Sequence, residues 1–244
     1  MRALSTPELL SIWERGLARS SVHLALMLLA SACPECEPES LARLSMGQRD
    51  SLLFALRESV FGQMMTSIVT CPVCGEELEF DFASSDICMR NEEHCHEMQH
   101  ILDSGYEVQF RLPNSLDLAA IDGLKDLAIA EKLLLSYCVL SSKKDGDEIE
   151  VDQLPEEIVD AIAEKMAQAD PRGDIQLAIV CSSCGHKWML IFDIVSFFRR
   201  EIDSWARRIL LEVHLLASAY GWSEADILAM SPNRRQIYLE MSCG

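Results

Sequence analysis

The sequence predicts an α+β protein that is mostly α-helical, with two short β-hairpins set among the helices. Apolar residues recur at helical spacing in the first quarter of the chain and again after residue 193. Strict alternation of apolar and polar residues, which is typical of half-buried strands, appears at residues 78–82 and 106–112. Two Cys-x-x-Cys motifs each lie between strand-like segments. These three observations together predict a helical chain that carries small sheet elements.

An N-terminal helical segment is expected over residues 1–66. Residues 5–8 combine a hydroxyl cap, a proline in the first turn and a glutamate that can bond back to the cap, so a helix should begin there. Residues 22–33 are apolar like an export signal, but acidic residues precede them and the run is too short to cross a bilayer. We therefore expect them to form a buried helix, followed by another over Met46–Phe61.

The first hairpin is predicted over residues 67–83, where one strand leads into Cys71-Pro-Val-Cys74-Gly and an alternating strand follows. The second is predicted over residues 175–193, around Cys181-Ser-Ser-Cys184-Gly. This pattern of strand, Cys-x-x-Cys-Gly turn and strand is the one clear internal repeat.

An inserted, mostly helical module is expected between the hairpins, over residues 84–174. Its first part, to residue 104, is polar and irregular, and residues 106–112 form a strand. Helical patterns follow, including residues 127–140 and 155–169, and the charged run 143–150 is expected to be a loop.

The C-terminal segment, residues 194–244, is predicted to be helical. A long helix over residues 195–220 should stop at Gly221, which suits a left-handed helix end. Ser223 and Ser231 then open two short helices.

The four cysteines of the two turns are the candidate metal ligands: Cys71, Cys74, Cys181 and Cys184. Structural zinc prefers four tetrahedral ligands, and a two-residue spacer lets both thiolates of a turn face one ion. Because the two motifs are about a hundred residues apart, we expect a split four-cysteine zinc ribbon whose halves are separated by the inserted module.

Other interpretations of the cysteines remain open at this point. A redox Cys-x-x-Cys would open a helix, and neither turn does. Two independent metal sites would need ligands from the polar stretch after the first hairpin, namely Cys88, Cys95 or the neighbouring histidines. A third pair, Cys33 and Cys36, lies between prolines in a loop without strands and is not expected to bind metal. Cys138 is expected in the core.

Catalysis has little support in the sequence. Four thiolates make a closed site, whereas a catalytic zinc keeps an open position. We expect His186, which follows the second turn, to lie at the surface or beside the metal ligands, and His214 to be a satisfied core histidine. We therefore predict a protein that is not an enzyme.

The composition bears on partners and location. A net charge of −18 opposes binding to nucleic acid or an anionic membrane and favours partners with basic patches. Three pairs of neighbouring arginines, expected on solvated or partner-facing helix surfaces, are Arg199/Arg200, Arg207/Arg208 and Arg234/Arg235. Ten cysteines without a secretion signal or a disulfide-rich composition indicate a reducing cytoplasm.

The order of several short motifs resembles a known family. In the first third of the chain these are Leu10-x-x-Trp13-Glu14-x-Gly16, Ala32-Cys33-Pro34, Gly47-x-Arg49-Asp50, Leu56-Arg57-Glu58 and Cys71-Pro72-x-Cys74-Gly75-Glu76. Further along they are Phe110-x-Leu112-Pro113, Asp117-Leu118, Glu212-Val213-His214-x-Leu216-Ala217-x-x-Tyr220-Gly221-Trp222-Ser223-Glu224, Ile227-Leu228 and Ser231-Pro232-x-Arg234-Arg235-x-x-Tyr238-Leu239.

These motifs resemble the zinc-ribbon-bearing baseplate proteins, or baseplate hub assembly chaperones, of contractile phage tails and phage-tail-like contractile injection systems. The resemblance implies a non-enzymatic role in building or completing the baseplate, with other baseplate, spike or hub proteins as partners. It implies a place in the cytoplasm of a bacterial or phage-infected cell, with incorporation into the particle left open. The alternative from the residues is a zinc-ribbon adaptor that binds nucleic acid or transcription machinery, which the charge disfavours.

Overall fold

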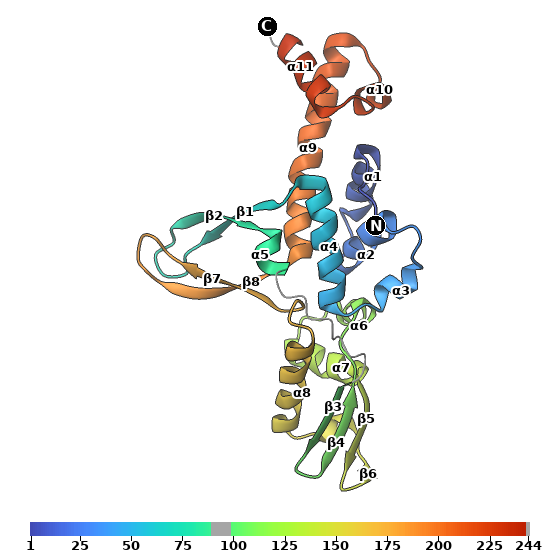
Figure 1. Cartoon of the computed structure of the whole chain (residues 1–244), viewed down its shortest axis with the longest axis vertical. Coiled ribbons are helices and arrows are strands. Elements are labelled where there is room, and N and C mark those ends of the chain that lie inside the picture. Colours follow the sequence, from blue (N-terminus) through green and yellow to red (C-terminus); the bar gives the residue numbers. More distant parts are fainter. Residues whose placement is uncertain (89–98, 243–244) are drawn as a thin grey trace.

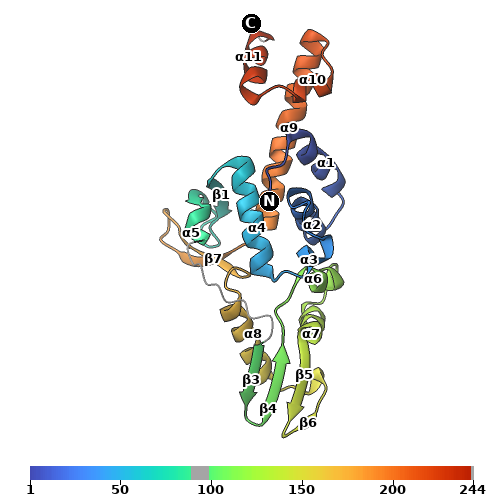
Figure 2. The same ribbon diagram turned by 45° about the vertical axis from the view of Figure 1, so that its right-hand side comes forward.

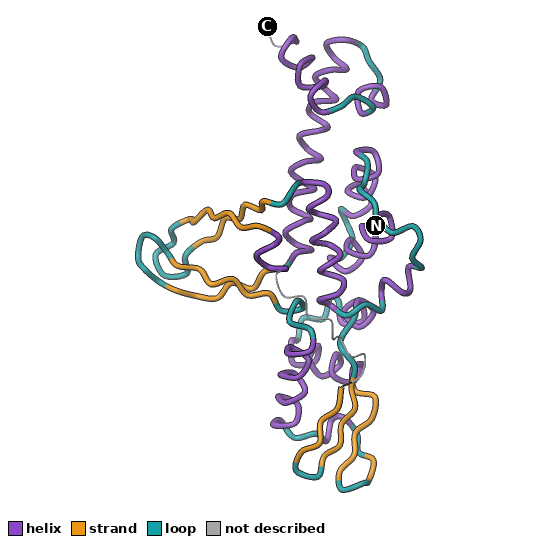
Figure 3. The backbone as a smooth tube through the Cα atoms, in the orientation of Figure 1, coloured by secondary structure: helices purple, strands orange, loops and turns teal. Residues whose placement is uncertain are grey.

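A long helix, α9 (Ile194–Tyr220), forms the axis of the molecule in a computed structural model that describes residues 1–88 and 99–242 (Figure 1). Helices surround the lower half of α9, a pair of hairpins projects to one side, and a separate module lies below. Figure 2 shows the same arrangement after a turn about the vertical axis, and Figure 3 separates helices from strands by colour.

The N-terminal helices are α1 (Thr6–Gly16), α2 (Ser21–Ala32), α3 (Pro38–Ala42) and α4 (Met46–Phe61). Helices α1, α2 and α4 pack beside the first half of α9, and α3 packs on α2. As predicted, α1 begins at a capping box, in which the Glu8 carboxylate accepts from the N–H of Ser5 at 2.9 Å. Helix α2 is the apolar run that resembled an export signal, and it is buried in the core. No helix within the described residues is both long and apolar enough to span a membrane.

The far end of α9 carries two short helices, α10 (Glu224–Leu228) and α11 (Pro232–Ser242). Gly221 ends α9 with φ 71°, the left-handed conformation expected of it. The buried Arg235 side chain ties α11 back to α9, because its Nε donates to the Glu212 carboxylate at 3.0 Å.

The two hairpins form separate two-stranded antiparallel sheets. One pairs β1 (Met64–Thr70) with β2 (Glu77–Ala83), and the other pairs β7 (Ile175–Val180) with β8 (Lys187–Phe192). A short helix, α5 (Ser84–Cys88), follows the first hairpin. Both hairpins extend from the helical body in the same direction and their turns meet at the far end (Figure 1). We refer to the two hairpins together as the arm.

The inserted module contains a sheet as well as the predicted helices. Its helices are α6 (Ser115–Ile121), α7 (Leu127–Cys138) and α8 (Glu156–Ala169), with a 3-10 turn at Val151–Gln153. Its four antiparallel strands, in the order β3-β4-β5-β6, are β3 (Gln99–Asp103), β4 (Tyr106–Phe110), β5 (Val139–Lys144) and β6 (Asp147–Glu148). One core holds the sheet and α8 together through the buried side chains Ile101, Val108, Phe110, Leu154, Ile158 and Ile162.

This sheet corrects the sequence prediction in two places. The charged run at residues 143–150 is not simply a loop, because β5 and β6 turn tightly at Asp145 and Gly146, whose φ angles are 51° and 95°. Residues 99–103 form β3 rather than irregular chain. Both segments are mostly exposed, so their strand character comes from pairing with β4 and its neighbours rather than from a hydrophobic pattern of their own.

The module is joined to the first turn of α4. The Asp170 carboxylate, just beyond α8, accepts a hydrogen bond from the N–H of Gly47 at 2.8 Å. Arg172 donates to the hydroxyl of Ser51 at 3.0 Å. Because α4 begins there, Asp170 also satisfies one of the N–H groups that a helix start leaves unpaired. A side chain at position 47 would exclude this contact, since a Cβ would lie 1.9 Å from Asp170 Oδ1.

We predict that Gly47→Ala lowers the free energy of unfolding by about 1–3 kcal/mol, the usual cost of overpacking, although alanine normally favours a helix. Urea denaturation of the full chain measures it. In an Asp170→Ala background the same substitution should cost less, because only the Arg172 Cβ at 3.0 Å remains close. An equal cost in both backgrounds would contradict this account of the junction.

Candidate metal centre

Each hairpin of the arm ends in the same tight turn. In the first turn the N–H of Cys71 donates to the carbonyl of Glu76 at 2.8 Å, and the N–H of Gly75 donates to the carbonyl of Cys71 at 3.0 Å. In the second, the N–H of Cys181 donates to the carbonyl of His186 at 2.8 Å, and the Gly185 N–H donates back to Cys181 at 2.9 Å. The two turns are therefore copies of one local structure.

A glycine is required at the end of each turn. Gly75 and Gly185 have φ angles of 75° and 72°, a conformation that costs other residues energy. This left-handed step lets the chain reverse directly after the second cysteine. Both cysteines of a turn then face the same side of the hairpin tip.

The four cysteine sulfurs converge where the two turns meet. Sγ of Cys71 lies 3.7 Å from Sγ of Cys184, and Sγ of Cys74 lies 3.6 Å from Sγ of Cys181. All four ligand atoms lie within 4.8 Å of one another. A disulfide would bring two sulfurs to about 2 Å. Tetrahedral zinc with bonds of about 2.3 Å would separate its sulfurs by about 3.8 Å, so this cluster can hold such an ion.

The thiols of Cys71 and Cys74 have shifted pKa values of opposite direction. The N–H of Cys74 donates toward the Cys71 sulfur and lowers the pKa of that thiol to about 7. The pKa of Cys74 is raised to about 12: the Glu76 N–H lowers it, but burial and the sulfurs of Cys181 and Cys184 raise it more. One thiolate forms readily, and the next is disfavoured because the thiols are crowded together. A divalent cation would remove this conflict by replacing the protons.

The base of the arm is fixed by aromatic side chains. Phe82, near the end of β2, and Phe192, the last residue of β8, contact edge to face with ring centroids 5.3 Å apart. Phe192 also stacks on Phe54 of α4 at 6.0 Å and contacts Phe197 of α9 at 5.3 Å. The two hairpins thus leave the helical body from one aromatic cluster, here called the base cluster. This role was not predicted from the sequence, although the alternating pattern of residues 78–82 places Phe82 on the apolar face of its strand.

The remaining cysteines lie either outside this cluster or outside the described residues. Cys33 is buried and Cys36 exposed, and neither belongs to a metal-like cluster within the described part of the chain. Cys138 is fully buried, as predicted. Cys95, the side chain of Cys88 and the histidines at 94 and 96 lie outside the described residues, so the two-site interpretation stays untested.

The two histidines have different surroundings. The His186 ring, which follows the second cysteine turn, stacks on Trp188 with ring centroids 5.6 Å apart. His214 is exposed on α9, so the prediction of a core histidine is wrong. It lies next to Val213 in sequence, but one step of about 100° around the helix moves it off the buried stripe.

The family model for T4 bacteriophage base plate protein matches residues 21–199. The chain belongs to this family. No curated protein and no solved structure matches it. The matched range runs from the start of α2 into the second turn of α9, so it contains the whole arm, all four clustered cysteines and the inserted module.

Several residues of the sequence resemblance have clear structural roles. Trp13 of α1 donates its Nε1–H to the Asp203 carboxylate of α9 at 3.0 Å. Arg57 of α4 donates to the Glu201 carboxylate of α9 at 2.8 Å and to the Gly62 carbonyl at 2.6 Å. These contacts join the N-terminal helices to α9 and fix the point where β1 begins.

We predict that Phe192→Ala lowers the free energy of unfolding by about 3–5 kcal/mol, because it removes a buried ring from the base cluster. The matched control is Ile191→Ala on the same strand, where the side chain is 73% exposed and the change should stay within about 0.5 kcal/mol. Hydrogen exchange of β1 and β7 should also accelerate in Phe192→Ala. Similar effects of the two substitutions would contradict the role given to the base cluster.

Proposed function

We propose that the chain binds one structural Zn²⁺ through Cys71, Cys74, Cys181 and Cys184. The support is the donor set, four thiols whose sulfurs lie within 4.8 Å of one another at the tips of two matching turns. In this proposal the parts of the chain are an N-terminal segment (1–66), a split zinc ribbon (67–83 and 175–193), an inserted module (84–174) and a C-terminal segment (194–244). With all four positions taken by protein, the ion would stabilise the arm and leave no site for a substrate.

Zinc content tests this directly. We predict about one zinc per chain in the wild type and in Cys36→Ser, and loss of zinc in Cys181→Ser, as measured by atomic emission on the purified full chain. Cys36→Ser is the matched control because it removes an exposed cysteine from a Cys-x-x-Cys that has no partner turn. Cys181→Ser should also lower stability, since metal binding contributes to folding. Full zinc retention in Cys181→Ser would overturn the shared site.

We further propose that the protein is a non-enzymatic assembly factor or structural component of the baseplate of a contractile phage tail or phage-tail-like injection system. The family match over residues 21–199 carries this proposal. A closed thiolate site and a projecting arm support a role in holding surfaces for other proteins. Its partners would be other baseplate, spike or hub proteins, met in the cytoplasm of the producing cell during assembly.

The charge of the arm argues against the nucleic-acid alternative. Strand β2 exposes the acidic residues Glu77, Glu79 and Asp81, whereas the four strands of the arm carry a single basic residue, Lys187. Such a surface repels phosphate. A DNA titration at low salt separates the two functions, because genuine phosphate binding would appear there and weaken steeply with added salt.

Association with the baseplate is the test of the main proposal. We expect the protein to copurify with baseplate, spike or hub proteins in assembly intermediates, in finished particles, or in both. Presence in intermediates alone identifies an assembly chaperone, and presence in the particle identifies a permanent component. Its absence from intermediates and particles alike would contradict the proposed function.

A further inference from the structure

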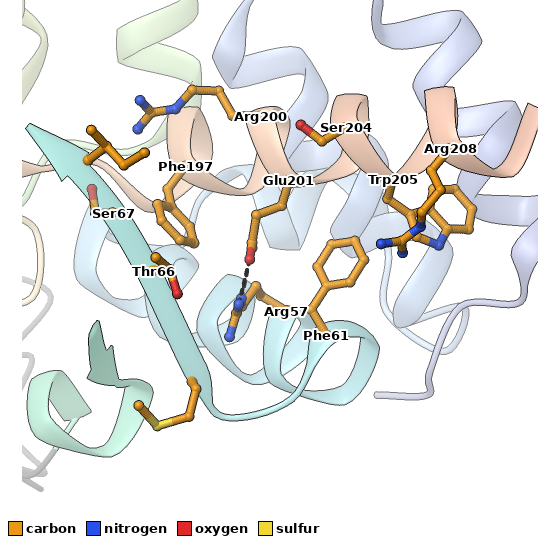
Figure 4. A pocket seen from close by; sticks show the side chains of 12 residues that line it. Arg57, Phe61, Thr66, Ser67, Phe197, Arg200, Glu201, Ser204, Trp205 and Arg208 are labelled. Carbon is orange, nitrogen blue, oxygen red and sulfur yellow. Dashed lines mark hydrogen bonds and ion pairs between the residues drawn. The ribbon is translucent and has the colours of Figure 1, made fainter. Parts of the chain in front are cut away.

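A groove of about 670 Å³ lies between strand β1 and helix α9. Figure 4 shows β1 passing beneath α9, with the side chains of Arg200, Ser204 and Arg208 on the helix above it. The apolar part of the lining comes from Phe61, Met64, Ile68, Phe197 and Trp205. Met64 and Ile68 are 58% and 61% exposed, which is high for such residues beside a packed core.

The groove runs along the unpaired edge of β1. It is lined by β1 residues from the exposed face, such as Thr66, and from the buried face, Ser67, but by none from β2. Since its other walls come from α4 and α9, the groove lies on the side of β1 that faces away from β2. Within residues 1–88 and 99–242 β1 pairs with β2 alone, so the sheet ends at this edge.

The backbone groups of this edge are available for pairing. The hydrogen bonds from Cys71 N–H to Glu76 and from Ser84 N–H to Gln63 show that odd-numbered positions of β1 face β2. The N–H and C=O groups of Thr66 and Ile68 therefore point away from β2, and they bond to no other element in the described part of the chain. A strand edge in this state is a template for another strand.

The charge of the groove is opposite to that of the protein. Arg200 and Arg208 are exposed and have no ion-pair or hydrogen-bond partner within residues 1–88 and 99–242. They lie two turns apart on one side of α9, about 12 Å along the helix axis. The one acidic residue in the lining, Glu201, is already bound to Arg57. A protein of net charge −18 thus presents a local cationic site beside an apolar floor and a free strand edge.

We propose that this groove binds an extended acidic segment of a partner protein, which adds to β1 as a further strand. Its backbone pairs with Thr66 and Ile68, its apolar side chains cover Met64 and Ile68, and its carboxylates bind Arg200 and Arg208. Strand addition supplies affinity through main-chain hydrogen bonds, and side chains give specificity. Symmetric pairing of β1 with β1 of a second copy would leave both arginines unmatched, because β1 (Met64–Thr70) carries no acidic residue. Pairing through the acidic strand β2 of a second copy is the competing outcome that sedimentation tests.

The proposal rests on the proposed function only in assuming a protein partner, and its test is independent of zinc content and of baseplate association. The probe is a pool of capped nine-residue peptides that alternate Asp or Glu with Val, Ile, Leu or Phe. A matched pool has Lys in place of the acids. Fluorescence anisotropy with the full-length protein measures binding of each pool.

We expect the acidic pool to bind at least about tenfold more tightly than the lysine pool, and Arg200→Glu/Arg208→Glu to reverse this preference. The control Arg43→Glu/Arg207→Glu changes the net charge equally at exposed positions outside the groove, and it should keep the wild-type preference. A peptide of the acidic pool with alternate N-methyl groups should lose binding, because one edge can no longer pair.

Three results would overturn the proposal: no binding of the acidic pool, unchanged preference in the Arg200→Glu/Arg208→Glu variant, or undiminished binding of the N-methylated peptide. A dimer in sedimentation that Arg200→Glu/Arg208→Glu dissociates would also overturn it, since a second copy would then occupy the edge. Circular dichroism of each variant confirms that the fold is intact before binding is compared.

Discussion

The contact between Phe82 and Phe192 is the constraint on which the arm depends. Both rings lie in the base cluster, and each is the eighth residue after the second cysteine of its own hairpin, Cys74 or Cys184. Two hairpins of equal length that start from one point and extend in one direction must end at the same height. The four sulfurs therefore meet at the tip because the two rings meet at the base. The inserted module does not disturb this geometry, since its chain leaves and returns at the base of the arm.

This arrangement explains why a bound metal ion would contribute strongly to the stability of the arm. An isolated two-stranded hairpin is marginally stable in water, and the arm consists of two such hairpins that share no ladder hydrogen bonds. The second hairpin buries little beyond Ile179 and Phe192. The base cluster fixes one end, and a four-thiolate ion would fix the other. The ion would stiffen the arm and keep the edge of β1 in a constant position relative to α9.

Much of this could be predicted from local sequence signals. The turns, the long helix and its stop at Gly221, and the burial of Cys138 each follow from a pattern within a few residues. The sheet of the inserted module could not be predicted in full, because the short, polar β6 is a strand only through its partner β5. The groove between β1 and α9 could not be predicted from the sequence either. The sequence shows Arg200 and Arg208 as members of two arginine pairs, and only the fold distinguishes them from Arg207, which is bound to Asp203.

The net charge of the protein disfavours an acidic partner, whereas the groove favours an acidic segment. A net charge of −18 repels an acidic protein as a whole, and this repulsion acts before the surfaces touch. The attraction of Arg200 and Arg208 is local, because salt screens exposed charges beyond about 8 Å at physiological ionic strength. A partner that satisfies both conditions carries its acidic residues in a short extended segment on a neutral or basic body. The neutral or basic body of such a partner is not repelled by the acidic protein, and its acidic segment then binds Arg200 and Arg208. An acidic surface and a basic groove in one protein therefore favour one class of binding partner.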